Sequence, residues 1–128
     1  MNIIRNSLIK FCACFLLLSY SACAYATTPD CTDPEGWPCS MAFTYLKNAG
    51  ILNNDELNYS KTQITRLSSE KIGKDLYRQI HLIRFTKISG AKLVVITIND
   101  ASNIECSMSD VAVYLVAKEF GNYSSNAK

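Results

Sequence analysis

Cysteine and histidine are the residues of this chain whose chemistry could define a site. The chain contains six cysteines and one histidine, His81. A thiolate could act as a nucleophile if a base lay within hydrogen-bond reach, and several thiols with an imidazole could bind zinc. His81 lies in the strand-like stretch RQIHLIRF, where a histidine is typical of a half-buried sheet residue. The remaining chemistry is a disulfide, and whether one forms depends on the compartment.

Residues 1–26 have the order of a secretory signal peptide. Arg5 and Lys10 give a positive start, residues 11–18 are apolar, and residues 24–26 (Ala-Tyr-Ala) form a small-residue cleavage site. The apolar segment is too short to span a bilayer. We therefore expect cleavage after Ala26 and a periplasmic or secreted protein.

Two alternatives concern the same N-terminal segment. Cys23 follows small residues and could carry a lipid anchor, although Tyr20 stands where such a site normally has leucine. The segment could also stay uncut as a membrane anchor. In the preferred interpretation the protein has no stable membrane insertion after signal cleavage.

Signal cleavage would leave Cys31, Cys39 and Cys106, and in an oxidising compartment two of three cysteines are expected to pair. A bridge to Cys106 closes a loop of roughly 70 residues, worth about 4 kcal/mol, whereas a Cys31–Cys39 bridge is worth about 2.5 kcal/mol. Cys39 lies on the apolar face of a predicted helix, where a free thiol is acceptable. We predict Cys31–Cys106, with Cys39–Cys106 and then the local pair as alternatives.

The other chemical motifs of the chain are weak. Residues 99–110, NDASNIECSMSD, are acidic but lack the glycine and closing glutamate of an EF-hand loop. No G-x-S-x-G is present, and EKIGKD is not a phosphate-binding loop. An Asx turn at Asn99–Asp100 and one helical turn at residues 102–105 account better for this segment. We predict no catalytic residues, no metal and no cofactor.

Composition excludes several partners. The chain has 13 Lys+Arg and 11 Asp+Glu, and the loss of Arg5 and Lys10 would leave 11 of each. A neutral chain offers no electrostatic attraction to nucleic acid or to an anionic membrane surface. The remaining length of about a hundred residues corresponds to one small domain.

The elements that would position these residues follow from periodicity. Residues 27–37 read as an extended arm, and residues 38–120 as a single α+β domain with a flexible tail at 121–128. Pro38 suits a helix start and Gly50 its end, with apolar residues at helical spacing in between: Cys39, Ala42, Phe43, Leu46 and Ala49.

Four strands should follow the helix. They are a polar edge strand at 59–67, a long strand at 76–86, a central strand at 93–98 that is apolar on both faces, and a last strand at 111–117. Short connections favour an antiparallel meander with the helix packed across one face. This order resembles cystatin-like folds in architecture only, and many unrelated functions share such an architecture.

Binding is the function class that these features favour. We expect an inhibitor or immunity-type protein that meets another exported or envelope protein through a loop, with Trp37, Asp100, Ser102, Asn103 and Glu105 as candidate contacts. The alternative is an envelope-accessory or structural subunit of a larger exported complex. A small secreted enzyme that uses Cys106 with His81 is the least favoured.

The cysteine assignment predicts one disulfide and one free thiol in the mature protein. Intact-mass measurements with and without reduction should show this state, and peptide mapping should join Cys31 to Cys106. Alkylation of two or more thiols before reduction would contradict the bridge.

Overall fold

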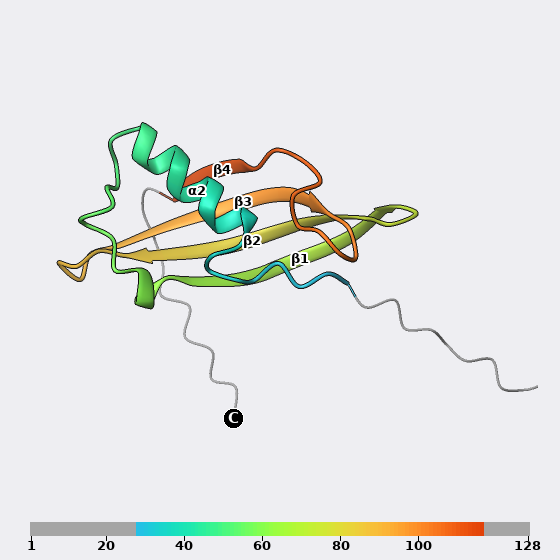
Figure 1. The fold of residues 1–128 in the computed structure, drawn as a ribbon, viewed down its shortest axis with the longest axis horizontal. Coiled ribbons are helices and arrows are strands. Elements are labelled where there is room, and N and C mark those ends of the chain that lie inside the picture. Colours follow the sequence, from blue (N-terminus) through green and yellow to red (C-terminus); the bar gives the residue numbers. More distant parts are fainter. Residues whose placement is uncertain (1–27, 117–128) are drawn as a thin grey trace, which may run out of the picture.

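The computed structural model describes residues 28–116, which form one helix and a four-stranded sheet (Figure 1). The helix, α2, spans Trp37–Asn48, and a short 3-10 turn, η1, spans Tyr59–Lys61. The strands are β1 (Gln63–Gly73), β2 (Leu76–Thr86), β3 (Lys92–Ala101) and β4 (Ala112–Val116). They lie in the order β1-β2-β3-β4 and each pair is antiparallel. The predicted α+β meander is confirmed.

Local sequence explains where α2 begins and ends. Proline in the first turn lacks only an N–H that would have no partner there, and Pro38 occupies this place one residue after the helix begins. Gly50 follows the last turn with a φ of 70°, a left-handed conformation that glycine adopts without strain. The inward face buries Pro38, Cys39, Ala42 and Leu46. Ala49, predicted on that face, is exposed as the C-cap residue.

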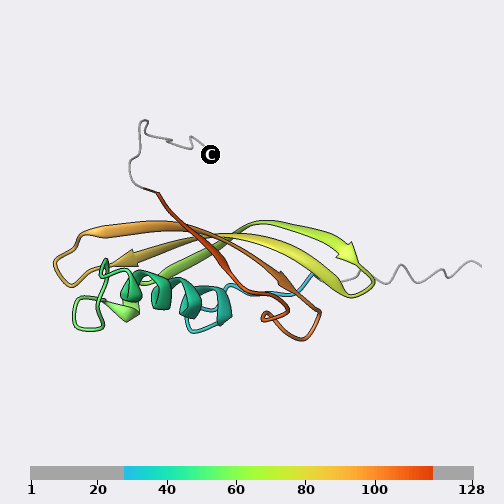
Figure 2. The same ribbon diagram turned by 90° about the horizontal axis from the view of Figure 1, so that it is seen from above.

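The core lies between α2 and one face of the sheet. Alternate residues of β2 are buried on this face, including Ile83 and Phe85, and Val95 of β3 joins them. Figure 2 shows α2 on one side of the sheet, while among the described residues no element covers the other side. The predicted packing of one helix across one face is therefore confirmed.

The helix is too short to cover the whole of this face. Twelve helical residues extend about 18 Å, whereas eleven strand residues extend about 36 Å. Figure 1 shows α2 over one half of the sheet and the two non-helical segments over the other half. These segments are the N-terminal arm, residues 28–36, and the 102–111 loop between β3 and β4.

Strand boundaries differ from the sequence prediction mainly in β1. This strand runs to Gly73 instead of Leu67, because its polar second half pairs with β2 as far as Leu76. Its register shifts at two places, between Arg66 and Ser68 and between Lys71 and Gly73. The predicted start at Tyr59 was wrong, since this residue begins the 3-10 turn.

The last two strands also have different ends. β3 continues to Ala101, so the predicted Asx turn at Asn99–Asp100 is wrong and both residues belong to the sheet. β4 begins at Ala112, one residue later than predicted, and its last described residue is Val116. Cross-strand pairing with β2 explains the extension of β3, because Asn99 and Asp100 lie opposite Gln79 and Arg78.

Removal of one buried methyl group tests the position of the core. Ile83 is fully buried, whereas Ile88 in the β2–β3 connection is 69% exposed. Ile83→Val should lower the free energy of unfolding by about 1 kcal/mol, and Ile88→Val should leave it nearly unchanged. Urea unfolding followed by circular dichroism measures both. Equal effects of the two changes would contradict the assigned core.

Candidate functional site

A disulfide joins the N-terminal arm to the 102–111 loop. Cys31 and Cys106 are bonded with their Cα atoms 5.8 Å apart, and they are 75 positions apart in sequence. The predicted pair is therefore confirmed, and the alternative Cys39–Cys106 is not formed. Cys39 is free and buried on the inward face of α2, as predicted. Such a bridge indicates an oxidising, extracytoplasmic compartment, while the signal peptide and Cys23 lie outside the described residues.

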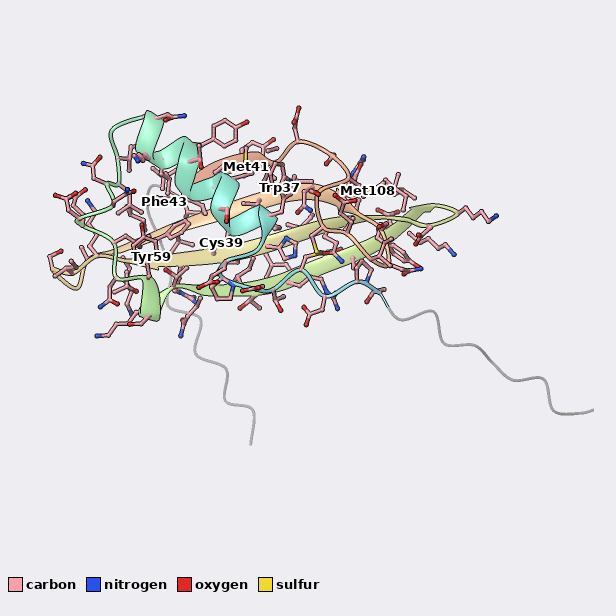
Figure 3. The ribbon with its side chains drawn as sticks, viewed as in Figure 1. Trp37, Cys39, Met41, Phe43, Tyr59 and Met108 are labelled. Carbon is pink, nitrogen blue, oxygen red and sulfur yellow. A yellow bond between two sulfur atoms is a disulfide. The ribbon has the colours of Figure 1, made fainter. Side chains whose placement is uncertain are left out.

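Hydrogen bonds hold the base of the 102–111 loop against its surroundings. The Asn99 side-chain amide donates to the carbonyl of Cys106 at 2.9 Å, and the Trp37 indole N–H donates to the carbonyl of Ser109 at 3.2 Å. The backbone N–H of Asp100 donates to the Ser109 hydroxyl at 2.8 Å. The loop is thus attached to β3, to α2 and, through the disulfide, to the arm (Figure 3).

The tip of the loop is a tight turn. The Ser102 hydroxyl accepts the backbone N–H of Glu105 at 3.1 Å, and the N–H of Ser102 donates to the Glu105 carbonyl at 2.7 Å. The second bond runs opposite to the direction found in a helix, so the predicted helical turn at residues 102–105 is wrong. The N–H of Asn103 also donates to the Asp75 carboxylate at 3.0 Å, which ties the tip to the β1–β2 connection.

The predicted contact residues separate into two groups. Asp100 forms an ion pair with Arg78 at 3.0 Å in the sheet, and Ser102 is buried in the turn that it stabilises. Asn103 and Glu105 are exposed at the tip, and Trp37 is 36% exposed at the start of α2. At the loop, only the second group offers side chains to a partner, whereas the Asp100 side chain is 16% exposed on the opposite face of the sheet.

Sequence reasoning missed the most exposed apolar residue of this region. Ile104 is 94% exposed at the loop tip, and Met108 in the same loop is 46% exposed. A lone isoleucine between polar neighbours in SNIE was the available signal, since a turn of purely structural function does not need an aliphatic side chain there. The exposed side chains of the loop and of the adjoining helix start are therefore Trp37, Asn103, Ile104, Glu105, Met108 and Asp110.

A buried polar cluster lies on the inner face of the sheet, in the half of that face that α2 does not cover. His81 is opposite Thr97 in the register and Gln79 is opposite Asn99, and all four are buried. The Gln79 amide donates to the Pro29 carbonyl at 2.8 Å. Several atoms of the cluster have no hydrogen-bond partner within the described residues, including both ring nitrogens of His81. Such atoms cost stability when buried.

Burial also sets the ionisation of the two groups with catalytic potential. Loss of hydration, reinforced by the positive charge of Arg66, lowers the pKa of His81 to about 4, although Asp30 and Asn99 oppose this shift. Burial raises the pKa of the Cys39 thiol to about 12, and the charge of Asp33 adds to the effect. Near neutral pH the imidazole is thus neutral and enclosed, and the free thiol is protonated.

An apolar groove of about 560 Å³ lies beside α2. Cys39, Phe43 and Tyr59, labelled in Figure 3, line it together with Phe85. The Phe43 ring lies 6.0 Å from that of Tyr59 and 6.3 Å from that of Phe85, measured between centroids. Asp33 and Glu35 of the arm border the groove. It can accommodate an apolar group, but its thiol is not activated as a nucleophile.

Comparisons of the chain with known proteins identify no relative. Neither protein-family models, curated proteins nor solved structures give a match to the chain. Within residues 28–116 no three His, Cys, Asp or Glu side chains gather as a metal site requires. The same part of the chain contains no helix that is long and apolar enough to cross a membrane.

The low pKa of His81 predicts a pH-dependent stability. In the unfolded chain His81 has its ordinary pKa of 6.5 and binds more protons than in the folded protein, where the pKa is about 4. The free energy of unfolding should therefore fall by about 3 kcal/mol as the pH drops from 6.5 to 4. Asp30, the nearby acid, has a pKa held below its usual range by the Thr32 hydroxyl and N–H.

Urea unfolding at several pH values checks this contribution. The glutamine of His81→Gln cannot be protonated, so this variant should lose less stability over the same pH range. The carboxyl groups titrate in both proteins, and their contribution therefore cancels in the comparison. Parallel stability curves for the two proteins would show that the histidine is not enclosed in this way.

Proposed function

We propose that this protein is a non-catalytic binding protein of an extracytoplasmic compartment, an inhibitor or immunity-type protein that acts on another exported or envelope protein. The single observation that carries the proposal is Ile104, which is 94% exposed at the tip of a braced loop. An aliphatic side chain held fully in water contributes nothing to the core and is suited to fill a pocket of a partner.

The surroundings of Ile104 support a contact surface. Trp37 and Met108 are further exposed apolar residues at the base of the loop, while Asn103 and Glu105 flank Ile104 with polar groups. Apolar anchors with a polar rim are the usual composition of protein interfaces, in which tryptophan and methionine are enriched. The Trp37 indole N–H is already bonded to Ser109, so its ring position is fixed before binding.

Bracing of the loop favours affinity. The disulfide and the bonds from Asn99, Trp37 and Asp75 hold the loop in one shape. A loop that is already ordered loses less conformational entropy when it binds, and therefore keeps more of the contact energy as affinity. A rigid scaffold that presents a loop is a common arrangement for recognition.

A structural or accessory subunit of a larger exported complex is the second candidate function. It is supported by a different surface, the sheet face opposite α2, which no other described element covers and where Tyr114 is 57% exposed and Val116 is 41% exposed. An enzyme that uses Cys106 with His81 has less support, because Cys106 is in the disulfide and His81 is buried.

Replacement of Ile104 tests the proposed contact. Ile104→Asp should leave the free energy of unfolding within about 0.5 kcal/mol of the original, because the side chain is in water. The binding free energy for the partner protein that affinity capture isolates should weaken by 2 kcal/mol or more, about a 30-fold rise in the dissociation constant. The reason is that an unpaired charge would enter the partner's pocket. Ile88→Asp is the matched control, since Ile88 is also highly exposed but lies in the β2–β3 connection.

Affinity capture from exported and envelope fractions, followed by calorimetric titration of the isolated partner, provides the measurement. The original protein and the Ile88→Asp variant should bind one partner in a fixed stoichiometry. Equal binding by the Ile104→Asp variant, or failure of the original protein to retain any exported protein, would refute the loop as the binding site.

A further inference from the structure

One face of the sheet is largely apolar, and no element of residues 28–116 covers it. Even-numbered residues of β2 and β3 point away from α2, because the odd-numbered ones form the buried face. Figure 2 shows no described element on this side of the sheet. The apolar side chains that share this face, defined here as the open-face band, are Ile80, Leu82, Val94, Ile96, Ile98, Tyr114 and Val116.

The band departs from the usual pattern of a sheet with one solvated face. Such strands alternate between apolar and polar residues. In β3 the solvent side instead carries Val94, Ile96 and Ile98 in succession, as apolar as the side that faces the helix. On β4, Tyr114 and Val116 lie beside Ile96 and Val94, so the apolar surface continues across the strands. The residues of β2 and β3 in the band are half-buried, and Tyr114 and Val116 are exposed. A contiguous apolar patch that water still reaches is typical of an interaction surface.

Charges at the two ends of the band indicate what covers it. On β3 the residues of this face run Lys92, Val94, Ile96, Ile98, Asp100. The pattern is basic at one end, acidic at the other and apolar between, with Ile96 at its centre. A two-fold rotation about Ile96 reverses the direction of the strand. It therefore places Lys92 of one strand opposite Asp100 of the rotated strand.

The summed charge of the neighbouring strands keeps this polarity, although β2 itself carries an arginine at each end of the face, Arg84 and Arg78. Arg84 of β2 lies beside Val94 and adds a second positive charge near the Lys92 end. At the other end Glu70 of β1 lies beside Arg78, which is paired with Asp100, so that two acids surround one base. The two ends of the face thus carry opposite net charge, positive at Lys92 and negative at Asp100.

We propose that the open-face band binds a second copy of this chain, with a two-fold axis through Ile96. Two-fold symmetry requires a self-complementary surface, and the antisymmetric charges of β3 meet this requirement when the two β3 strands are antiparallel. Lys92 of each copy then faces Asp100 of the other, and Ile96 packs on Ile96. Two sheets stacked in this way form a sandwich about 10 Å thick.

This dimer leaves the proposed binding loop free. In Figure 2 the 102–111 loop curves toward the side of the sheet that carries α2, away from the open-face band. Each dimer would therefore present two loops outward. The inference does not depend on the loop function, and either can fail alone.

Sedimentation equilibrium over a wide concentration range tests the association, with the disulfide intact. The original protein should show a mass that rises with concentration from one copy to two. Tyr114→Lys should remain a single copy, and because Tyr114 is more than half exposed on an edge strand its fold should persist. Tyr45→Lys is the matched control, since Tyr45 is a similarly exposed tyrosine on α2 and should not change the dimer.

A charge reversal tests the orientation of the two copies. Lys92→Asp should weaken the dimer about tenfold, because it places two carboxylates opposite each other. Adding Asp100→Asn should recover part of that loss, because it removes the facing carboxylate while its side-chain oxygen can still accept from Arg78. Lys71→Asp makes the same charge change on the opposite face of β1, where Lys71 is exposed beside Tyr77, and should have no effect.

Three results would overturn the proposal. The first is a single-copy mass for the original protein at all concentrations up to the millimolar range. The second is an association that Tyr114→Lys and Tyr45→Lys weaken equally, and the third is an association that appears only after removal of residues 117–128. That last result would assign the band to this segment of the same chain instead of a second copy.

Discussion

The short helix is the constraint on which the rest of this structure depends. A 12-residue helix covers about half the length of the two central strands, so the remaining half of the inner sheet face needs another cover. Residues 28–36 and the 102–111 loop provide it, and neither has regular structure of its own. The Cys31–Cys106 bridge joins these two segments over the sheet and replaces the packing that a longer helix would supply.

This cover explains why the sheet is so polar beneath the bridge. Under α2 the inner face carries Phe85, Ile83 and Val95, whereas under the arm it carries His81, Gln79 and Asn99. Extended segments expose their own carbonyl groups to the sheet, and the Gln79 and Asn99 amides bond to the carbonyls of Pro29 and Cys106. The same bonds hold the loop whose tip presents Ile104. The contacts that hold the arm on the sheet therefore also fix the shape of the candidate site.

Much of the fold could be predicted from local patterns. The limits of β2, the helix near Pro38 and the preferred disulfide all follow from periodicity, turn residues and loop length. The errors lie where tertiary pairing decides. β1 continues through a polar segment because β2 offers partners, and Asn99 and Asp100 join β3 for the same reason. Ile104 was missed although its polar neighbours were a signal, because its exposure depends on the turn between Ser102 and Glu105 that the tertiary structure shows.

The sequence by itself determined the class of the molecule, that is, the helix, the four strands and their antiparallel order. These features depend on hydrophobic period and short connections, which act between neighbours along the chain. Only the tertiary structure decided which polar residues are enclosed and which apolar ones remain in water. His81 is buried because the arm and the 102–111 loop cover the half of the inner face that the 12-residue helix leaves open. Ile104 is exposed at the tip of that loop, and the open-face band is partly exposed because no element of residues 28–116 lies on that side of the sheet.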